Sequence, residues 1–291
     1  LSGCEPAILM ALFAAVPHLH FLIPCYGGQI SEATFTSFVR FTVQARDWGI
    51  DWTLDTLVNE SLIPRGRNAL VARAMANPLA THVMFVDSDI MFEPADVLAL
   101  VQEDVEVIGG GYPKKNLPID YVINPSIDGF QDEGKIEVMR LGTGFLLIKR
   151  HVFSRIAEAS PHLKYVDDCG LDPSLNPYLY AYFDCGLVPG HDVYMSEDWM
   201  FCNRWRDLGG KVYLSKRFAL GHVGAFLFSE AAQARVLSSM MMGNRADSSI
   251  PSAAEAAPEF EGAPAADDLA PDVEGKRSVK PRRSTRSRKG A

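Results

Sequence analysis

"THVMFVDSDIMF", residues 81–92, ends an apolar run with two aspartates that stand one residue apart. The run before Asp87 predicts a buried strand, and Asp87 and Asp89 follow at its carboxyl end. Residues two apart share one face of a strand, and where the chain turns both side chains can reach one point. Two carboxylates at one point repel unless a cation lies between them. The stretch therefore predicts a site for Mn²⁺ or Mg²⁺, which accept oxygen ligands.

Segments typical of strands and helices alternate on both sides of this stretch. We expect strands at 18–28, 50–58, 82–87 and 105–112, and helices at 31–48, 68–76 and 94–102. This order predicts an α/β fold with a parallel, doubly wound sheet. Ligands bind beyond the carboxyl ends of the strands in such sheets. Polar or glycine-rich segments converge there, at 24–28, 59–67, 87–89 and 109–115.

The alternation stops after residue 120. Residues 135–153 suggest a hairpin-like pair of strands and then a helix, and residues 161–194 form a long irregular segment. A helix capped by Ser196 is expected over 196–210, followed by a strand. We expect one catalytic domain over 1–244 and a disordered tail over 245–291, acidic first and basic last.

The composition excludes several classes of protein. The chain has 291 residues, 47% of them hydrophobic, and a net charge of −8, which argues against a body that wraps nucleic acid. Its five cysteines lack a C-x-x-C pair, which favours free thiols in a reducing compartment such as the cytoplasm. The apolar run at 6–16 is too short to span a bilayer, so we expect no transmembrane segment. "LSGC" at 1–4 has the form of a lipoprotein cleavage box but lacks the apolar segment before it.

A longer stretch, "PRGRNALVARAMANPLATHVMFVDSDIMFEPADVLAL" at 64–100, resembles the donor-binding half of GT-A glycosyltransferases, especially family-2-like enzymes. "LGTGFLLIKRHVF" (141–153) is similar to their glycine-rich strand beside the sugar pocket, and "YMSEDWMFCNRWRDLGGKVYL" (194–214) resembles their acidic helix and following strand. The resemblance covers about residues 18–228 and extends to enzymes encoded by large DNA viruses and phages. It implies a doubly wound mixed sheet with a Rossmann-like N-terminal half.

The same resemblance implies a metal-dependent enzyme of the hexosyltransferase class that uses a nucleoside-diphosphate sugar. Asp89 would bind the metal directly, Asp87 would bind the metal, a metal-bound water or the ribose, and His222 in "GHVG" would be a further ligand. The other residues that would hold the donor are Pro24, Tyr26, Gly27, Asn59, Glu60, Arg65, Asn68, Lys114 and Lys115.

Asp198 would act as the general base that takes a proton from the acceptor hydroxyl, and Glu197 is its alternative. An Asp198 base favours inversion at the anomeric carbon. Carboxylates are also favoured in the first turn of any helix, which is the ordinary explanation for both residues. Aromatic residues that could stack on sugar rings are Trp199, Trp205, Tyr178, Tyr180, Tyr182 and Tyr194.

Departures from the family limit the interpretation. No Gln-x-x-Arg-Trp motif and no following transmembrane helices are present, so transfer of a single sugar fits better than processive synthesis. A haloacid-dehalogenase-type phosphatase with Asp87 as nucleophile is one alternative, although Met91 stands where that family has Thr or Val. A sugar nucleotidyltransferase is another, but no G-x-G-T-R-like loop occurs near residue 25.

The acceptor stays open between a glycan, a protein and a modified nucleic acid. A third alternative is a non-catalytic protein that binds carbohydrate or nucleic acid. In that case the basic segment 276–291 would contact phosphate backbones or other acidic surfaces and would be sensitive to salt.

Overall fold

The computed structural model describes residues 17–230, except for 117, 119, 122, 126–129, 189–191 and 218, and leaves the side chains of 123–125 undescribed. The expected tail and the apolar segment at 6–16 lie outside the described residues. Eight strands form the main sheet in the order β2-β1-β3-β8-β5-β11-β7-β6. These strands are β1 (His18–Cys25), β2 (Asp51–Val58), β3 (His82–Val86), β5 (Val107–Gly109), β6 (Ile123–Pro125), β7 (Lys135–Leu141), β8 (Phe145–Lys149) and β11 (Val212–Ser215).

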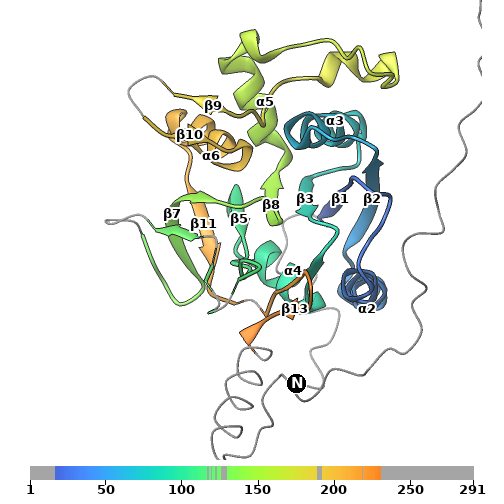
Figure 1. Cartoon of the computed structure of the whole chain (residues 1–291), viewed down its shortest axis with the longest axis vertical. Coiled ribbons are helices and arrows are strands. Elements are labelled where there is room, and N and C mark those ends of the chain that lie inside the picture. Colours follow the sequence, from blue (N-terminus) through green and yellow to red (C-terminus); the bar gives the residue numbers. More distant parts are fainter. Residues whose placement is uncertain are drawn as a thin grey trace, which may run out of the picture. The chain divides into compact units, whose positions relative to one another are not determined.

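The predicted mixed, doubly wound α/β fold is confirmed. Strands β2, β1 and β3 run parallel, as do β5 and β11, whereas β8 runs antiparallel to both of its neighbours, β3 and β5. Helices cover both faces of the sheet (Figure 1). They are α2 (Glu32–Trp48), α3 (Ile63–Ala76), α4 (Pro94–Gln102), α5 (Arg150–Ala159) and α6 (Glu197–Asp207).

The hairpin expected over 135–153 is wrong. Strands β7 and β8 follow one another in sequence, but β5 and β11 lie between them in the sheet. Phe145, Leu146, Leu147 and Ile148 of β8 are all buried, whereas Met139 of β7 is exposed. A strand with apolar side chains on both faces is stabilised most in the centre of a sheet covered by helices on both sides. This is why β8 leaves its sequence neighbour and inserts between β3 and β5.

Alternating side chains of the central strands divide the core into two clusters. Met84 and Val86 of β3 pack with α2 and α4, and Val83 and Phe85 pack with α3, α5 and α6. This period of two is the geometry of a strand buried on both faces. Asp87 continues the set of Val83 and Phe85, so its side chain emerges on the side of α3 and α6.

The helix caps follow the sequence. Ser31 accepts a hydrogen bond from the Thr34 backbone, as expected for an N-cap, and Gly49 ends α2 in the left-handed conformation with a φ of 69°. Helix α3 begins at Ile63 with Pro64 in its first turn, five residues before the expected start. Arg65 and Arg67 therefore lie in a helix and not in a loop.

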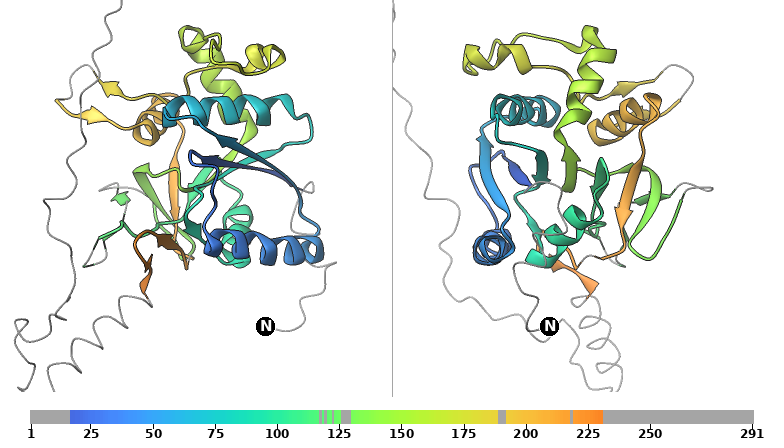
Figure 2. Two further views of the ribbon diagram at one scale, coloured as in Figure 1. Left: turned by 45° about the vertical axis from the view of Figure 1, so that its right-hand side comes forward. Right: turned by 180° about the vertical axis from the view of Figure 1, so that it is seen from behind.

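Two small sheets complete the described part of the chain. One contains β4 (Ile90–Met91), β12 (Gly221–Val223) and β13 (Leu227–Phe228), and the other pairs β9 (Gly186–Leu187) with β10 (Tyr194–Met195). The sheet of β4, β12 and β13 lies below the main sheet in Figure 1, whereas β9 and β10 lie beside α6 in Figures 1 and 2. Among the described helices, none is long and apolar enough to cross a bilayer.

Candidate functional site

Asp87 is held by an arginine that the sequence analysis did not single out. Nη1 of Arg67 donates to Asp87 Oδ1 at 3.0 Å and Nη2 donates to Oδ2 at 3.3 Å, a bidentate ion pair. Nε of the same guanidinium donates to Glu197 Oε1 at 3.1 Å. Arg67 thus joins the end of β3 to the first turn of α6, and its contact with Glu197 spans 130 residues of sequence.

The Arg67 side chain is only 4% exposed. Burial lowers its pKa, but the charges of Asp87 and Glu197 outweigh this effect, so the pKa is raised and the guanidinium stays charged. The sequence carried a signal for this contact. Arg67 precedes the buried residues Leu70, Val71 and Ala74 at intervals of three, four and seven, which puts all of them on one helix face.

Asp89 has different partners from Asp87. Lys115 Nζ donates to Asp89 Oδ2 at 2.6 Å, and His222 Nε2 lies 3.4 Å from Oδ1. Burial tends to raise the pKa of Asp89, but hydrogen bonds from His222 and Lys115 outweigh burial and lower it below the usual aspartate value. Asp89 follows β3 in a turn, and His222 is paired with Ile90 in the antiparallel register of β4 and β12. The tertiary fold therefore brings together two of the three residues that the sequence predicted as metal ligands.

His222 is oriented by its second ring nitrogen. Its Nδ1 lies 2.9 Å from the carbonyl oxygen of Pro113. A carbonyl oxygen only accepts, so Nδ1 carries a proton and donates to it, and this contact turns Nε2 towards Asp89. The ring of Tyr112 packs edge-on against the imidazole at 5.5 Å. Metal-binding histidines are commonly oriented in this way, with the far nitrogen donating to a carbonyl.

The donor atoms fit a divalent cation. An imidazole nitrogen and a carboxylate that face one another are ligands that Mn²⁺ accepts, and two protein ligands leave positions for phosphate oxygens. Among the described residues, however, no group of three or more His, Cys, Asp or Glu side chains is close enough to hold a metal. Of the three predicted ligands, Asp87 is separated from Asp89 and His222 in its contacts, because both oxygens of Asp87 accept hydrogen bonds from Arg67. The three predicted ligands are therefore not brought together, and Asp89 and His222 are the pair that could hold a cation.

Asp198 is the carboxylate whose surroundings suit a base. Burial raises its pKa above the usual aspartate value, although the Ser196 hydroxyl opposes this by donating to Oδ1. The backbone N–H of Trp199 also donates to Oδ1, at 2.8 Å. Both of these hydrogen bonds end on one oxygen, so Oδ2 is the atom that would receive a proton. Ser196 was expected to cap α6, but its side chain makes no cap hydrogen bond.

Glu197 is bound by Arg67 and is less suited to be the base than Asp198. Its Oε1 accepts from the buried guanidinium, and the pair holds the first turn of α6 at the end of β3. Two neighbouring carboxylates of one motif therefore have separate environments. Glu197 positions the helix, and Asp198 presents a carboxylate of raised pKa.

The glycine-rich segment 141–144 lies beside Asp87. The backbone N–H of Asp87 donates to the Gly144 carbonyl at 2.9 Å, and the Gly144 N–H donates to the Tyr112 hydroxyl at 3.2 Å. A Cβ on Gly144 would be 2.7 Å from Tyr112 Cζ, so no side chain fits there. Glycine at 144 thus allows Tyr112 to lie between Asp87 and His222, and burial raises the pKa of this tyrosine.

The remaining predicted donor residues fall into two groups. Tyr26 is exposed after β1, and its carbonyl accepts from the N–H of Asn59, whose φ is 60°. Pro24 and Gly27 lie on either side of Tyr26 in the same turn region, so this group of predicted donor residues is accessible at the end of β1. By contrast, Arg65 pairs with Glu60 at 2.6 Å, which lowers the pKa of Glu60.

Asn68 has a structural role in place of the expected contact with the nucleotide. Its Nδ2 donates to the Phe183 carbonyl and its Oδ1 accepts from the Phe183 N–H, at 2.8 and 2.9 Å. The side chain is buried, and this reciprocal pair uses both ends of its amide. Asn68 therefore fastens the irregular segment over 161–194 to α3.

The aromatic candidates differ in accessibility. Trp205 is fully buried and donates to the Lys211 carbonyl, and Tyr182 is also buried, so both belong to the core. Trp199 lies beneath the guanidinium of Arg140, 4.7 Å from its centre, and Tyr194 is exposed. Lys114 pairs with Asp120 at 2.5 Å, whereas Lys115 pairs with Asp89.

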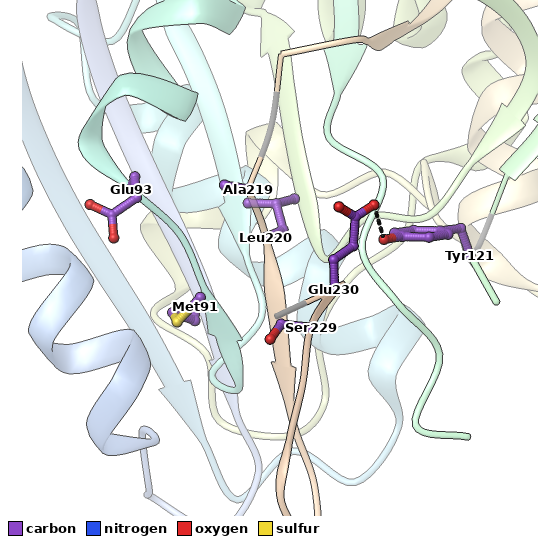
Figure 3. Close-up of a pocket in the computed structure, with 7 residues that line it drawn as sticks. All are labelled: Met91, Glu93, Tyr121, Ala219, Leu220, Ser229 and Glu230. Carbon is purple, nitrogen blue, oxygen red and sulfur yellow. Dashed lines mark hydrogen bonds between the residues drawn. The ribbon is translucent and has the colours of Figure 1, made fainter. Parts of the chain in front are cut away.

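A pocket of about 360 Å³ lies on the small sheet of β4, β12 and β13. Figure 3 shows the residues that line this pocket, which are Met91, Glu93, Tyr121, Ala219, Leu220, Ser229 and Glu230. The Tyr121 hydroxyl donates to Glu230 at 3.0 Å. The hydrogen-bond partners of the Asp89 and Asp198 side chains, which are Lys115, Ser196 and Trp199, are not in this set. Converging groups of both charges define the candidate site better than this pocket does, because the residues that line the pocket include no Lys, Arg or His.

Comparisons of the sequence with protein families and with curated proteins give no match. Among solved structures, A197 from STIV is similar at 17% identity, over 71% of this chain and 86% of that chain, with a TM-score of 0.44. The catalytic domain of Drosophila β1,4-galactosyltransferase 7, in complex with xylobiose, matches at 17% identity over 69% of this chain and 66% of its own length, with a TM-score of 0.39.

The inositol-1-phosphate CTP transferase from T. maritima matches at 11% identity over 78% of this chain and 96% of that chain, with a TM-score of 0.38. Both sugar transferases and nucleotidyltransferases are thus among the similar structures. At these identities and scores, the likenesses say nothing about the chemistry of this chain.

Proposed function

We propose that the protein is a metal-dependent glycosyltransferase that moves one sugar from a nucleoside-diphosphate donor to an acceptor hydroxyl, with inversion. The observation that carries the proposal is the meeting of Asp89 and His222 at the end of β3, with Asp198 at the start of α6. Arg67 links this helix to the same strand end through Glu197 and Asp87. A cation-binding pair and a base are the two functions that such a transfer requires.

Asp89 and His222 are the residues that would hold Mn²⁺ or Mg²⁺. When bound, the metal would neutralise charge on the leaving nucleoside diphosphate. Lys115 supplies a cation at the same carboxylate and is positioned to exchange Asp89 for a phosphate oxygen. Its two roles are compatible because a lysine on an exposed loop reorients at little cost.

Asp198 would accept the proton of the acceptor hydroxyl through Oδ2. Burial makes it more basic than an ordinary aspartate, which favours proton transfer near neutral pH. Ser196 and Trp199 fix the carboxylate by donating to Oδ1. Attack by the activated hydroxyl on the face opposite the leaving group inverts the anomeric carbon.

The phosphatase alternative fits the geometry less well. It requires an Asp87 oxygen that is free to attack phosphorus, but both Asp87 oxygens accept hydrogen bonds from Arg67. A carboxylate in a bidentate pair with a buried guanidinium is a weak nucleophile, because its charge is already neutralised. The nucleotidyltransferase alternative lacks a role for Asp198.

The test is a donor screen of the full chain with UDP-, GDP- and dTDP-sugars, read as release of nucleotide with and without Mn²⁺. We expect one class of donor to be turned over only with the metal, and Asp89→Asn to reduce turnover by at least about a hundredfold. Asp47→Asn, a change at an exposed aspartate of α2, is the matched control and should keep full activity. Absence of donor binding and of turnover would contradict the proposal.

A further inference from the structure

We infer that Lys115 competes with the divalent cation for the carboxylate of Asp89, and that a bound diphosphate ends this competition because it pairs with the lysine instead. The inference rests on the proposed function and names how binding at its metal site is regulated. It requires Mn²⁺ and a nucleoside diphosphate to strengthen one another's binding, since such coupling between two ligands is reciprocal. Lys115 thereby selects the pair of metal and diphosphate over the free metal ion.

The competition follows from the contacts of a single carboxylate. Lys115 Nζ donates to Asp89 Oδ2 at 2.6 Å, and His222 Nε2 lies 3.4 Å from Asp89 Oδ1. A cation that bound Asp89 and His222 together would therefore share the carboxylate with the ammonium group. Two positive groups on one carboxylate repel each other, and its single negative charge cannot compensate both. The lysine therefore opposes binding of the metal ion alone.

The chain segment that carries Lys115 also holds the histidine. The carbonyl oxygen of Pro113, two residues earlier, lies 2.9 Å from His222 Nδ1, and the Tyr112 ring packs edge-on against the same imidazole. The methylene groups of Lys115 lie close to Gly224, because a Cβ built on that glycine would be 3.1 Å from the Cδ atom of the lysine. The stem of the lysine is thus packed beside the two metal-binding residues. The exchange needs movement of the end of one side chain.

The ammonium group can leave Asp89 at little cost. The Lys115 side chain is 40% exposed, and water solvates both partners of such an ion pair when they separate. A diphosphate carries more negative charge than one carboxylate and offers several acceptor oxygens, so it attracts the ammonium group more strongly. A diphosphate that binds beside Asp89 would therefore take the lysine and leave the carboxylate to the metal.

The neighbouring arginine cannot make the same exchange. Arg67 is only 4% exposed, and its guanidinium is bound by both Asp87 and Glu197. Removing a buried charge from two partners is costly. Of the two cations that contact the aspartates at the end of β3, Lys115 is therefore the one that a diphosphate can recruit.

The first experiment measures binding of Mn²⁺ alone to the full chain by titration calorimetry. We expect Lys115→Met to bind Mn²⁺ about tenfold more tightly than the wild type, because the carboxylate of Asp89 has lost its competing cation. Lys149→Met is the matched control, since Lys149 also pairs with an aspartate, Asp104, at 2.6 Å and the change removes the same charge. Its affinity for Mn²⁺ should equal that of the wild type. An affinity of Lys115→Met equal to or weaker than that of the wild type overturns the inference.

The second experiment repeats the titration with UDP, GDP and dTDP in turn. The nucleotide that binds should tighten binding of Mn²⁺ about tenfold more in the wild type than in Lys115→Met. In the presence of Mn²⁺, the affinity for this nucleotide should fall about tenfold in Lys115→Met. One substitution would then tighten binding of the free metal and weaken binding of the diphosphate, which a general loss of structure does not do. Equal tightening by the nucleotide in both proteins contradicts the inference.

The outcomes separate this inference from the proposed function. If the wild type and Lys115→Met bind Mn²⁺ alike while turnover of a donor still requires Mn²⁺, the proposed function stands and the competition is refuted. If neither protein binds Mn²⁺, with or without a nucleotide, both the inference and the metal-dependent function are refuted.

Discussion

Asp87 and Asp89 are almost equally exposed, at 27% and 32%, but their partners differ in character. Asp87 is bound by both terminal nitrogens of a buried arginine, whereas Asp89 is bound by a lysine that is 40% exposed and also faces a histidine. Separating Asp87 from Arg67 would cost much free energy, because it would take a charged partner from a buried guanidinium. Separating Asp89 from Lys115 would cost little, because water solvates the lysine. The difference indicates that the Asp87 pair is the more firmly held of the two, and it supports the proposed role of Asp89 as the carboxylate that exchanges its partner for a metal.

The largest expected effect is on stability. Arg67→Met should lower the free energy of unfolding by about 3–5 kcal/mol, because Asp87 and Glu197 would lose their buried partner. Lys115→Met should lower it by at most about 1 kcal/mol. Urea unfolding measures both. Equal losses of stability in the two variants would contradict the difference between the Asp87 and Asp89 pairs. If Arg67→Met does not fold, the double variant Arg67→Met, Asp87→Asn should recover part of the stability.

Binding of Mn²⁺ should depend on Asp89 more than on Asp87, whereas stability should depend more on Asp87. Asp89→Asn should weaken binding of Mn²⁺ at least about tenfold, because one of two protein ligands loses its charge. Asp87→Asn should retain more of the affinity and lose more stability. Calorimetry with Mn²⁺ and the donor nucleotide gives the affinities, and denaturation gives the stabilities. A larger loss of Mn²⁺ affinity in Asp87→Asn would show that Asp87 leaves Arg67 to become the ligand.

The pH dependence of activity should report Asp198. Its pKa is raised by burial, and a base must be deprotonated, so kcat/KM should fall on acidification at a pH above the ordinary aspartate pKa of about 3.9. Asp89, whose pKa is lowered, stays ionised through this range. The profile of kcat/KM between pH 4 and 8 checks this, with Asp198→Asn expected to lose about 10²–10⁴ in kcat. An acid limb at or below the ordinary aspartate pKa would exclude Asp198 as the base.

The pH dependence of stability should separate Asp89 from Asp198. A carboxylate with a lowered folded pKa contributes stability above its unfolded pKa, and this contribution is lost as the pH falls through the folded pKa. The stability difference between the wild type and Asp89→Asn should therefore vanish in acid. Asp198 should show the opposite trend with pH. Its raised pKa means that the folded state binds the proton more tightly than the unfolded state does, so its cost to stability is relieved as the pH falls. Denaturation at several pH values measures both trends.

The smallest expected effect concerns Ser196. Its hydroxyl stabilises the charged form of Asp198, so Ser196→Ala should raise the pKa of the base further and shift the acid limb to higher pH. The loss of one hydrogen bond of this kind corresponds to about 1 kcal/mol, which is a shift of less than about one pH unit. Thr36→Ala, on the exposed face of α2, is the control. A shift to lower pH in Ser196→Ala would contradict the assigned direction of the hydrogen bond.

Local pattern was sufficient for much of the fold. The alternation of apolar strands and amphipathic helices predicted β1 to β3 with α2 and α4 close to their observed places, and Ser31 as the cap of α2. It also put Asp87 and Asp89 at the end of a buried strand. These features depend on residues near one another in the chain, where backbone geometry and capping hydrogen bonds decide the outcome.

The partners of the two aspartates were decided by the tertiary structure. The face of Asp87 follows from the alternation of Val83 and Phe85, but its contact with Arg67 and Glu197 needs α3 and α6 to meet over that face. The meeting of Asp89 with His222 needs β4 and β12 to pair across more than 130 residues of sequence. The sequence determined that carboxylates would lie at this edge of the sheet. Only long-range packing, which inserted β8 between β3 and β5 and set the order of the strands, determined which cation each carboxylate would face.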